Sequence, residues 1–425
     1  MSKRRGPGWS RLDNAAKIFP PTSNKSDPKV FRFSCELYEP VDPVLLSQAT
    51  DRTLELFPHF CSTLRRGIFW YFLESSPLRP QVHEENTPPC TPLYDPFRRG
   101  LLFSVSYYRC RIHFEVYHAL TDGTGALQFL RVLVYHYLLL AHAEDFPDGP
   151  PPMDYDASAA QREDDSFRRH YKAVRQQLRA YRLRGRAYQL AGPKLPEHRL
   201  RVLSGELSAK AVIAAAREKQ TTMTGFLAAV LMCAVNEEMA ARDRKRPVVL
   251  TIPVNLRKYF PSESTRNFFA IINVGYRFSG PNDSLEEVIN AIRRGFSSQL
   301  TYEKLGQRIT GLGALEHNSF LKIIPLPVKD FSLMLADRIS KRSVTGAFSN
   351  VGRVEMPAPL CKYIRLFDVF NSTNRLQLCA CSFGDRLMLS ATSPFLNTDV
   401  YRRFFRKLAG LGLEAVIYSN QPEEG

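Results

Sequence analysis

Apolar and polar side chains alternate over residues 111–117, where every second side chain is apolar. This period of two predicts a β-strand with one buried face. Residues 126–141 are apolar on nearly every side and predict a buried α-helix. The heptapeptide Tyr117-His-Ala-Leu-Thr-Asp-Gly123 lies between them. Its histidine is therefore predicted at the end of a strand, and its aspartate at the start of a helix.

The same patterns predict elements along the rest of the chain. Strands are predicted at residues 30–37, 69–73, 101–108, 199–207, 247–254, 268–278 and 344–348. Three further strands, at residues 363–370, 376–383 and 386–391, are predicted to form a meander. Helices are predicted at 43–57, 208–219, 224–241 and 399–413, with two or three more over 284–339. Asp42 and Ser208 are predicted N-caps. Strands and helices mix in both halves, which indicates an α/β protein.

The clearest change in composition lies at residues 143–165, a proline-rich and acidic stretch that we interpret as an exposed linker. A basic helical stretch follows, with eight arginines and lysines between Arg168 and Arg186. It is either a solvated helix face or a docking surface for an acidic partner. We therefore expect a first lobe at 1–142, this linker and basic helical segment at 143–195, and a second lobe at 196–425.

Several classes of protein are disfavoured by the sequence. The eight cysteines include no Cys-x-x-Cys pair, neither Cys nor His clusters with metal-ligand spacing, and no Gly-rich phosphate loop is present. We read no apolar run of the ~18 residues that a transmembrane helix needs. The first 14 residues are basic without an apolar stretch, so we expect no secretory signal. These features favour a cytoplasmic protein with reduced thiols.

The formal net charge of +16 is large for 425 residues. Such charge attracts nucleic acid, anionic membranes, or acidic small molecules and proteins. No nucleic-acid-binding motif accompanies it, so we expect no nucleic-acid partner. Coenzyme A carries several phosphates and acyl carrier proteins are acidic, so both remain open as partners on charge alone.

The histidine of the heptapeptide is the best candidate for chemistry. A neutral imidazole near pH 7 suits a general base acting on a hydroxyl, amine or thiol. Asp122 can brace the turn four residues after His118, through backbone hydrogen bonds or by pairing with an arginine, and it can also cap the helix. A His-x-x-x-Asp spacing also occurs by chance, so the candidate depends on its place between strand and helix.

In this setting His118, Asp122 and Gly123 resemble the HxxxDG signature of the chloramphenicol-acetyltransferase-like superfamily, which includes condensation domains and plant acyltransferases. The chain is most similar to bacterial alcohol acetyltransferase-like proteins, because residues 12–20 resemble their N-terminal segment. In related folds this segment lies near the active-site tunnel, so it is either a packed arm or faces the substrate. The resemblance implies an α/β, two-lobed CoA-dependent acyltransferase fold, each lobe a mixed sheet with helices.

The resemblance also implies partners for the motif. Residues 253–257 and 266–268 resemble a strand-arginine and the turn that follows it in plant acyltransferases, where an arginine commonly pairs with the motif aspartate. We therefore expect a structural salt bridge between Asp122 and Arg257, with Arg277 as the alternative. Asn350 resembles the asparagine of a Ser-Asn-x-Gly turn, and is either an oxyanion donor or a simple turn residue.

The sequence differs in two features from condensation domains and from the plant members of the superfamily. Tyr117 stands where condensation domains usually carry a second histidine, and the Asp-Phe-Gly-Trp-Gly signature of plant members is absent. The predicted catalytic residues are thus His118, Asp122, Gly123 and Asn350.

The implied function is transfer of an acyl group, for example acetyl, from acyl-CoA to a small alcohol or amine, with His118 as general base. Acyl-CoA is a co-substrate, and we expect no further cofactor, no metal and a monomer. Two alternatives stay open: a condensation-type enzyme that takes its acyl group from an acyl carrier protein, and a non-catalytic scaffold of the same fold.

Overall fold

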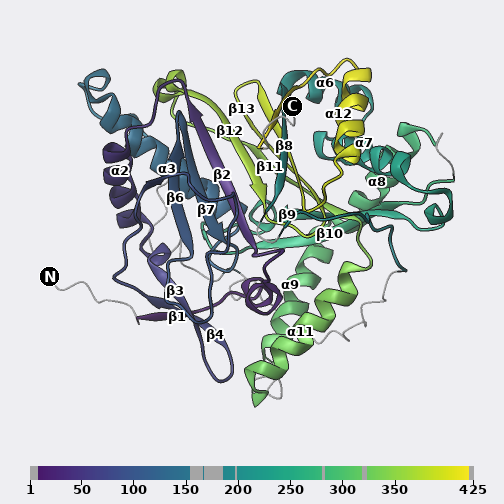
Figure 1. Cartoon of the computed structure of the whole chain (residues 1–425), viewed down its shortest axis with the longest axis horizontal. Helices are drawn as coiled ribbons and strands as arrows, with labels where there is room; N and C mark the ends of the chain where they lie inside the picture. Colours follow the sequence, from purple (N-terminus) through teal and green to yellow (C-terminus); the bar gives the residue numbers. More distant parts are fainter. Residues whose placement is uncertain are drawn as a thin grey trace.

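A computed structural model describes residues 8–153, 166, 185–196, 199–279, 283–317 and 323–420. Two mixed β-sheets, each covered by helices, form two lobes side by side (Figure 1). This confirms the predicted α/β class and the two mixed sheets. The basic stretch from Arg168 to Arg186 lies, apart from its last two residues, outside the described residues.

The first lobe is built on a five-stranded sheet in the order β12-β2-β7-β6-β5. Its strands are β2 (Val30–Leu37), β5 (His83–Glu84), β6 (Phe103–Tyr108), β7 (Arg111–Tyr117) and β12 (Ile364–Asn371). A smaller sheet contains β1 (Trp9–Arg11), β4 (Tyr71–Ser75) and β3 (Ser62–Arg66). The helices are α1 (Phe19–Thr22), α2 (Pro43–Leu56) and α3 (Gly123–Ala141). The last two pack on each other beside the five-stranded sheet (Figure 1).

The second lobe is built on a seven-stranded sheet in the order β10-β9-β11-β13-β14-β8-β15. Its strands are β8 (Arg201–Ser208), β9 (Val248–Asn255), β10 (Phe269–Tyr276), β11 (Gly346–Arg353), β13 (Leu376–Phe383), β14 (Arg386–Ser393) and β15 (Val416–Ser419). Its helices are α6 (Ala209–Glu218), α7 (Met223–Glu238), α8 (Leu285–Gln299), α9 (Tyr302–His317), α11 (Leu326–Lys341) and α12 (Asp399–Gly410). Nearly all of α7 is buried, in contact with α8 and α12.

The predicted caps are confirmed. Asp42 accepts hydrogen bonds from the amides of Val44 and Leu45, and Ser208 accepts one from Ala211. Each cap satisfies first-turn amides that have no partner within their own helix. The helices therefore begin where the sequence places them.

The predicted meander is wrong in its first strand. The strands β13 and β14 pair as a hairpin, but β12 pairs antiparallel with β2 in the first lobe. Most of β12 is buried, with no polar face to orient it, so the sequence pattern does not distinguish the two sheets. The predicted second lobe, residues 196–425, thus supplies one strand to the first lobe, and this strand forms an edge of the five-stranded sheet.

Among the described residues, helix α3 alone is long and apolar enough to cross a membrane by length and composition, contrary to the expectation that no apolar run reaches this length. More than half of its apolar window is buried. Phe129 from this helix packs against Phe60, Phe103 and Phe114 at the centre of the first-lobe core. We therefore interpret α3 as a core helix.

Candidate active site

His118 lies directly after β7 and is partly buried. Its backbone amide donates to the carbonyl of Lys29, which holds the histidine beside the start of β2. The Phe19 ring stacks on the imidazole at a centroid distance of 4.3 Å, and Phe31 lies against it at 4.9 Å. The ring is therefore fixed between aromatic side chains, with part of the residue still accessible.

Asn267 sets the tautomer of His118. Its Nδ2 donates to the His118 carbonyl at 3.1 Å and to Asp13 Oδ2 at 3.3 Å. This leaves Asn267 Oδ1 as the acceptor facing His118 Nδ1, at 3.2 Å. The proton is thus assigned to Nδ1 by the hydrogen-bond network, and the lone pair lies on Nε2.

Asp13 ties the N-terminal segment to this network. Besides the Asn267 side chain, its Oδ2 accepts the Asn267 backbone amide at 3.3 Å, and its Oδ1 accepts the amide of Ala16 at 2.7 Å. Asp13 is buried. The segment 12–20, singled out in the sequence, therefore reaches His118 twice, through Asp13 and Asn267 and through the stacked ring of Phe19.

The environment lowers the pKa of His118 below its ordinary value of 6.5. Burial is the main cause, because it disfavours the charged imidazolium. A hydrogen bond to its own backbone, the Asp122 carboxylate and the Asn267 hydrogen bond act in the opposite direction and raise the pKa, while Lys29 lowers it further. The net result favours the neutral ring, which is the form that can accept a proton.

Asp122 is buried and uses both carboxylate oxygens. Its Oδ1 accepts the amides of Thr124 and Gly125 at 3.1 and 3.0 Å, and so caps α3. Its Oδ2 accepts from Arg257 Nη1 and from the Phe268 amide, both at 2.8 Å. The carboxylate therefore joins the start of α3 to the second lobe.

Arg257 organises the loop between β9 and β10, residues 256–268, which we call the clamp loop. Its Nε and Nη2 donate to the Ser264 carbonyl at 2.9 and 2.7 Å, and Nη2 also donates to the Arg266 carbonyl at 2.6 Å. With its ion pair to Asp122, the guanidinium fixes the clamp loop against the first lobe. Arg277, the alternative partner, is exposed beyond the end of β10.

Gly123 and Gly125 differ sharply in their surroundings. A Cβ added at Gly123 meets no heavy atom within 4 Å. At Gly125 the same atom lies 2.0 Å from the Thr265 carbonyl oxygen and 2.3 Å from Thr121 Oγ1. The close approach of α3 to the clamp loop thus requires a glycine at 125. No steric reason singles out Gly123, and its predicted catalytic role stays a prediction.

Asn350 lies on β11, three residues beyond the last residue that pairs with β9. Its Nδ2 donates to Thr224 Oγ1 at 2.9 Å, and its Oδ1 accepts the Gly352 amide at 2.9 Å. Within the described residues, no recorded hydrogen bond joins Asn350 to the His118 network. Its part as an oxyanion donor stays a prediction.

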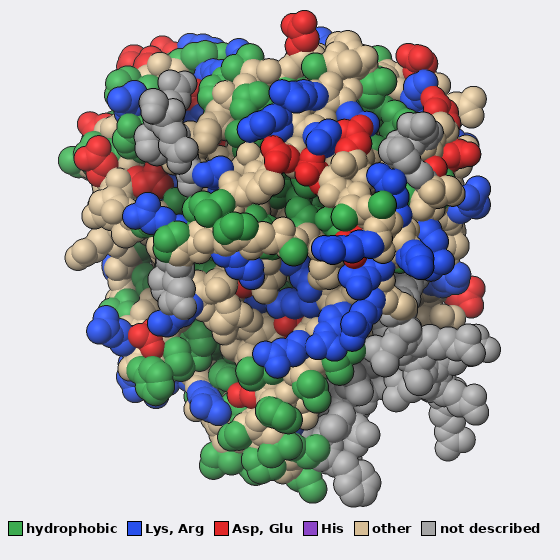
Figure 2. Space-filling view, turned by 45° about the vertical axis from the view of Figure 1, so that its right-hand side comes forward, with side chains coloured by type: hydrophobic (Ala, Val, Ile, Leu, Met, Phe, Trp, Pro, Cys, Tyr) green, Lys and Arg blue, Asp and Glu red, His purple; other side chains and the backbone are tan. Residues whose placement is uncertain are grey.

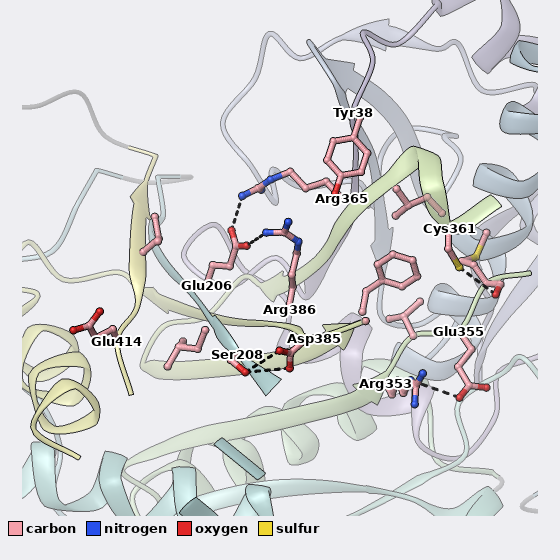
Figure 3. Close-up of a pocket in the computed structure, with 17 residues that line it drawn as sticks. Tyr38, Glu206, Ser208, Arg353, Glu355, Cys361, Arg365, Asp385, Arg386 and Glu414 are labelled. Atoms are coloured by element: carbon pink, nitrogen blue, oxygen red, sulfur yellow. Dashed lines mark hydrogen bonds and ion pairs between the residues drawn. The ribbon is translucent and has the colours of Figure 1, made fainter. Parts of the chain in front are cut away.

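A cavity of about 830 Å³ lies elsewhere between the two sheets (Figure 3). Arg365 and Arg386 both point to Glu206 there, and the Arg365–Glu206 distance is 2.6 Å. Tyr38 lines the cavity and lies directly after β2, whereas His118 contacts Lys29, the residue directly before β2. The cavity and His118 therefore lie at opposite ends of this strand. None of the predicted site residues lines it. Arg365 and Arg386 are taken up by Glu206, and Arg353 lies 3.8 Å from Glu355, so we assign the cavity no part in the site.

Several solved structures share the fold of this chain. Polyketide synthase associated protein 5 from Mycobacterium tuberculosis is 14% identical with a TM-score of 0.58, over 94% of this chain and 96% of that one. F. graminearum TRI101 complexed with coenzyme A and deoxynivalenol is 11% identical with a TM-score of 0.65, over 96% and 99%. The first condensation domain of the CDA synthetase is 15% identical with a TM-score of 0.59, over 93% of each chain.

This is the fold of the chloramphenicol-acetyltransferase-like and condensation-domain superfamily. Residues 193–262 also match the family described as phthiocerol/phthiodiolone dimycocerosyl transferase C-terminus, and this stretch contains β9 and Arg257. No curated protein matches the sequence. In this chain the fold places the HxxxDG heptapeptide where the clamp loop of the second lobe meets the first.

Asn267, Asp13, Phe19 and Phe31 lie at the site but were not among the predicted site residues. The first three lie in stretches that the sequence had marked by resemblance, residues 12–20 and 266–268, and Phe31 lies in the predicted strand at 30–37. Spacing gives no signal for them, because they are far from His118 in the chain and meet it only through the packing of other segments against it. The residue types alone, an asparagine, an aspartate and two phenylalanines, are common in loops and cores.

Proposed function

We propose that the protein is an acyltransferase that moves an acyl group from acyl-CoA to an alcohol or amine, with His118 as general base. The observation that carries the proposal is the orientation of one imidazole. Nδ1 is engaged by Asn267 and the ring is clamped by Phe19, so Nε2 is the nitrogen left to accept a proton.

In the proposed reaction the acceptor O–H or N–H donates its proton to His118 Nε2 as its heavy atom attacks the thioester carbonyl carbon. The C–O or C–N bond forms, and the carbonyl π electrons move to the oxygen. When the tetrahedral oxyanion collapses, the C–S bond breaks and the thiolate takes the proton from Nε2. No acyl-enzyme is needed, so no nucleophilic serine or cysteine takes part.

Two kinds of protein group assist His118 in the proposed reaction: a donor to the oxyanion, and residues that position the histidine. Asn350 or a backbone amide stabilises the oxyanion, because a donor placed where negative charge develops lowers the barrier. Asp122 and Arg257 are positioning residues, because their hydrogen bonds hold the heptapeptide and the clamp loop together. The proposal includes acyl-CoA as a co-substrate, no cofactor and no metal.

A second candidate takes the acyl group from an acyl carrier protein, since condensation domains share the fold. Tyr117 weighs against it, because it replaces the second histidine of those domains and is buried, with its hydroxyl 2.9 Å from Ser23 Oγ. A TRI101 structure with coenzyme A bound supports the CoA donor for this fold. The third candidate, a non-catalytic scaffold, does not account for the oriented imidazole.

Thiol release from acetyl-CoA and longer acyl-CoAs, with a panel of alcohols and amines, tests the proposal. We expect His118→Ala to lower turnover by about 10²–10⁴-fold while the fold stays intact. His83→Ala, on β5, is the matched control and should match the wild type. Turnover of His118→Ala close to the wild-type rate would refute the proposed base. Turnover of an acylated carrier protein, without turnover of acyl-CoA, would favour the second candidate. Turnover of neither donor would favour the third candidate.

A further inference from the structure

Helix α11 presents its apolar side to solvent. Of its 16 residues only Leu326 is buried. Five large apolar side chains with exposed fractions of 38–68% recur at helical spacing along one side: Val328, Phe331, Met334, Leu335 and Ile339. Surface helices normally turn their apolar side to the core. An exposed apolar stripe of this kind marks an interaction surface.

The inner side of α11 is polar and paired. Asp330 accepts from the Tyr71 hydroxyl at 2.9 Å, and Asp337 lies 2.6 Å from Lys341. Lys341 also lies 4.0 Å from Asp27, and α11 packs on α1. These contacts fix the rotation of the helix, so the apolar stripe cannot turn inward without breaking several polar interactions.

The tip of the β3–β4 hairpin extends the stripe. Leu326 at the start of α11 donates its amide to the Ile68 carbonyl at 2.8 Å, and Lys329 Nζ donates to the Phe69 carbonyl at 3.0 Å. Ile68 is 75% exposed and Trp70 43%. Hairpin and helix project together from one end of the molecule (Figure 1), where Figure 2 shows apolar side chains gathered. The α11 patch consists of Ile68, Trp70, Val328, Phe331, Met334, Leu335 and Ile339.

On the outer side of α11, the exposed charges of the described residues are basic. Both acidic residues of α11, Asp330 and Asp337, lie on its inner side with the partners given above. Arg338 and Arg342 are exposed on the outer side, towards the C-terminal end of the stripe. Arg66, next to the hairpin tip, has half of its side chain exposed and lies 3.6 Å from Asp330, so its charge is partly balanced. The surface that this end of the molecule offers is therefore apolar with a basic border.

We propose that the α11 patch docks on the surface of an anionic lipid membrane. A helix with an apolar face bordered by arginine lies in the interface of a bilayer, where its apolar side chains enter the headgroup region and its cations meet anionic lipids. A tryptophan at the border suits the same interface. The patch projects from the molecule and is not a groove, which fits a broad lipid surface. The net charge of +16 adds long-range attraction.

This inference does not rest on the proposed function, although α11 packs on α1, whose Phe19 stacks on His118. Docking would place the candidate site close to the lipid surface. Vesicle binding and thiol release are separate measurements, and either can fail without the other.

Flotation of the full chain with vesicles tests the proposal. Vesicles of phosphatidylcholine and phosphatidylglycerol in equal parts should bind the protein, and vesicles of phosphatidylcholine alone should bind it less. Replacing Phe331 and Leu335 together by serine should weaken partition by about tenfold or more. Arg338→Glu should reduce the difference between the two lipid compositions. Val44→Ser is the matched control, because Val44 is 62% exposed on α2, across the molecule from α11.

Melting curves of all variants should agree with the wild type, since the substituted side chains are exposed. Absence of wild-type binding to anionic vesicles would overturn the proposal. So would equal binding by the Phe331 and Leu335 variant. A concentration-dependent dimer that the same variant abolishes, without vesicle binding, would assign the patch to a second copy of the chain instead.

Discussion

The His118 ring is held neutral and in one orientation by separate features of the site. Burial lowers the pKa of the imidazole, whereas the Asn267 hydrogen bond raises it and fixes the tautomer. Stacking on Phe19 fixes the plane of the ring. These effects can be separated by experiment: burial and the Asn267 hydrogen bond change the pKa and so move the pH profile, whereas the orientation given by Asn267 and Phe19 changes the rate.

We expect the acid limb of kcat/KM to have its midpoint below 6.5. A general base must be unprotonated, and a lowered pKa keeps His118 neutral to lower pH before activity falls. In Asn267→Ala the midpoint should move lower still, because a contact that raises the pKa is gone. The plateau rate should fall by about 10²-fold through lost orientation. A midpoint at or above 6.5 in the wild type, or an unmoved midpoint in Asn267→Ala, would contradict this account.

The Asp122 carboxylate is predicted to act on the fold more than on the chemistry. In Asp122→Asn, a side-chain NH2 group replaces one carboxylate oxygen. This donor would face either the Arg257 guanidinium or the backbone amides that donate hydrogen bonds to the wild-type carboxylate. Breaking a buried ion pair in this way costs about 3–5 kcal/mol. Urea unfolding should therefore show a large loss of stability together with the loss of activity.

A double-mutant cycle of Asp122→Asn and Arg257→Gln separates pairing from independent effects. We expect a coupling free energy above about 0.5 kcal/mol, as found for residues in one polar network. A cycle without coupling would reject the pair as a unit. Loss of activity in Asp122→Asn with an unchanged unfolding curve would instead place Asp122 in the chemistry.

At the scale of elements, the clamp loop and the start of α3 form one contact between the lobes. Thr121 Oγ1 donates to the Thr265 carbonyl, and the Asn255 side chain donates to Thr124 Oγ1 at 3.1 Å. With the Asp122–Arg257 pair, these bonds surround the N-terminus of α3. The position of His118 relative to the second lobe depends on this contact.

Gly125→Ala is expected to break the contact. Its Cβ would lie 2.0 Å from the Thr265 carbonyl oxygen, a backbone atom that cannot move without the clamp loop. Overpacking of this kind costs about 1–3 kcal/mol. Gly123→Ala is the matched control: its Cβ meets nothing within 4 Å, and alanine favours a helix over glycine. Equal melting temperatures for the two variants would contradict the close approach. Lost activity in a stable Gly123→Ala would show that substrate uses the space there.

Local chemistry made several elements predictable. Strand β7, helix α3 and the caps at Asp42 and Ser208 follow from alternation, apolar periodicity and side-chain oxygens at helix starts. The heptapeptide could be placed between strand and helix for the same reason. The placement of β12 could not, because a strand buried on both faces fits either sheet.

The contacts of the site were harder to predict than its elements. Pairing of Asp122 with Arg257 was expected only through a family resemblance, since 135 residues separate them. Asn267 is 149 residues from His118, and its role depends on the docking of the clamp loop. Gly125 shows the same limit: its neighbour Thr265 is distant in sequence, so a steric requirement for glycine leaves no local pattern.

At the scale of the whole molecule, the positive charge of the protein would affect how it binds an anionic acyl donor. The chain carries +16 at neutral pH, and Lys and Arg side chains gather across the middle of the face in Figure 2. A phosphate-bearing donor that binds such a surface is attracted by charges in contact with solvent. This attraction is screened over roughly 10 Å at 0.1 M salt.

Binding of coenzyme A should therefore weaken as salt is added, and calorimetric titration at low and moderate salt measures it. Dephospho-coenzyme A, which lacks the 3′-phosphate, is the matched ligand and should show a smaller dependence on salt, because fewer phosphate charges are screened. Equal salt dependence would place that phosphate away from the basic surface. No binding of coenzyme A at low salt, together with tight binding of an acyl carrier protein, would transfer the donor role to the carrier. The same basic surface would then serve an acidic protein, with the His118 chemistry unchanged.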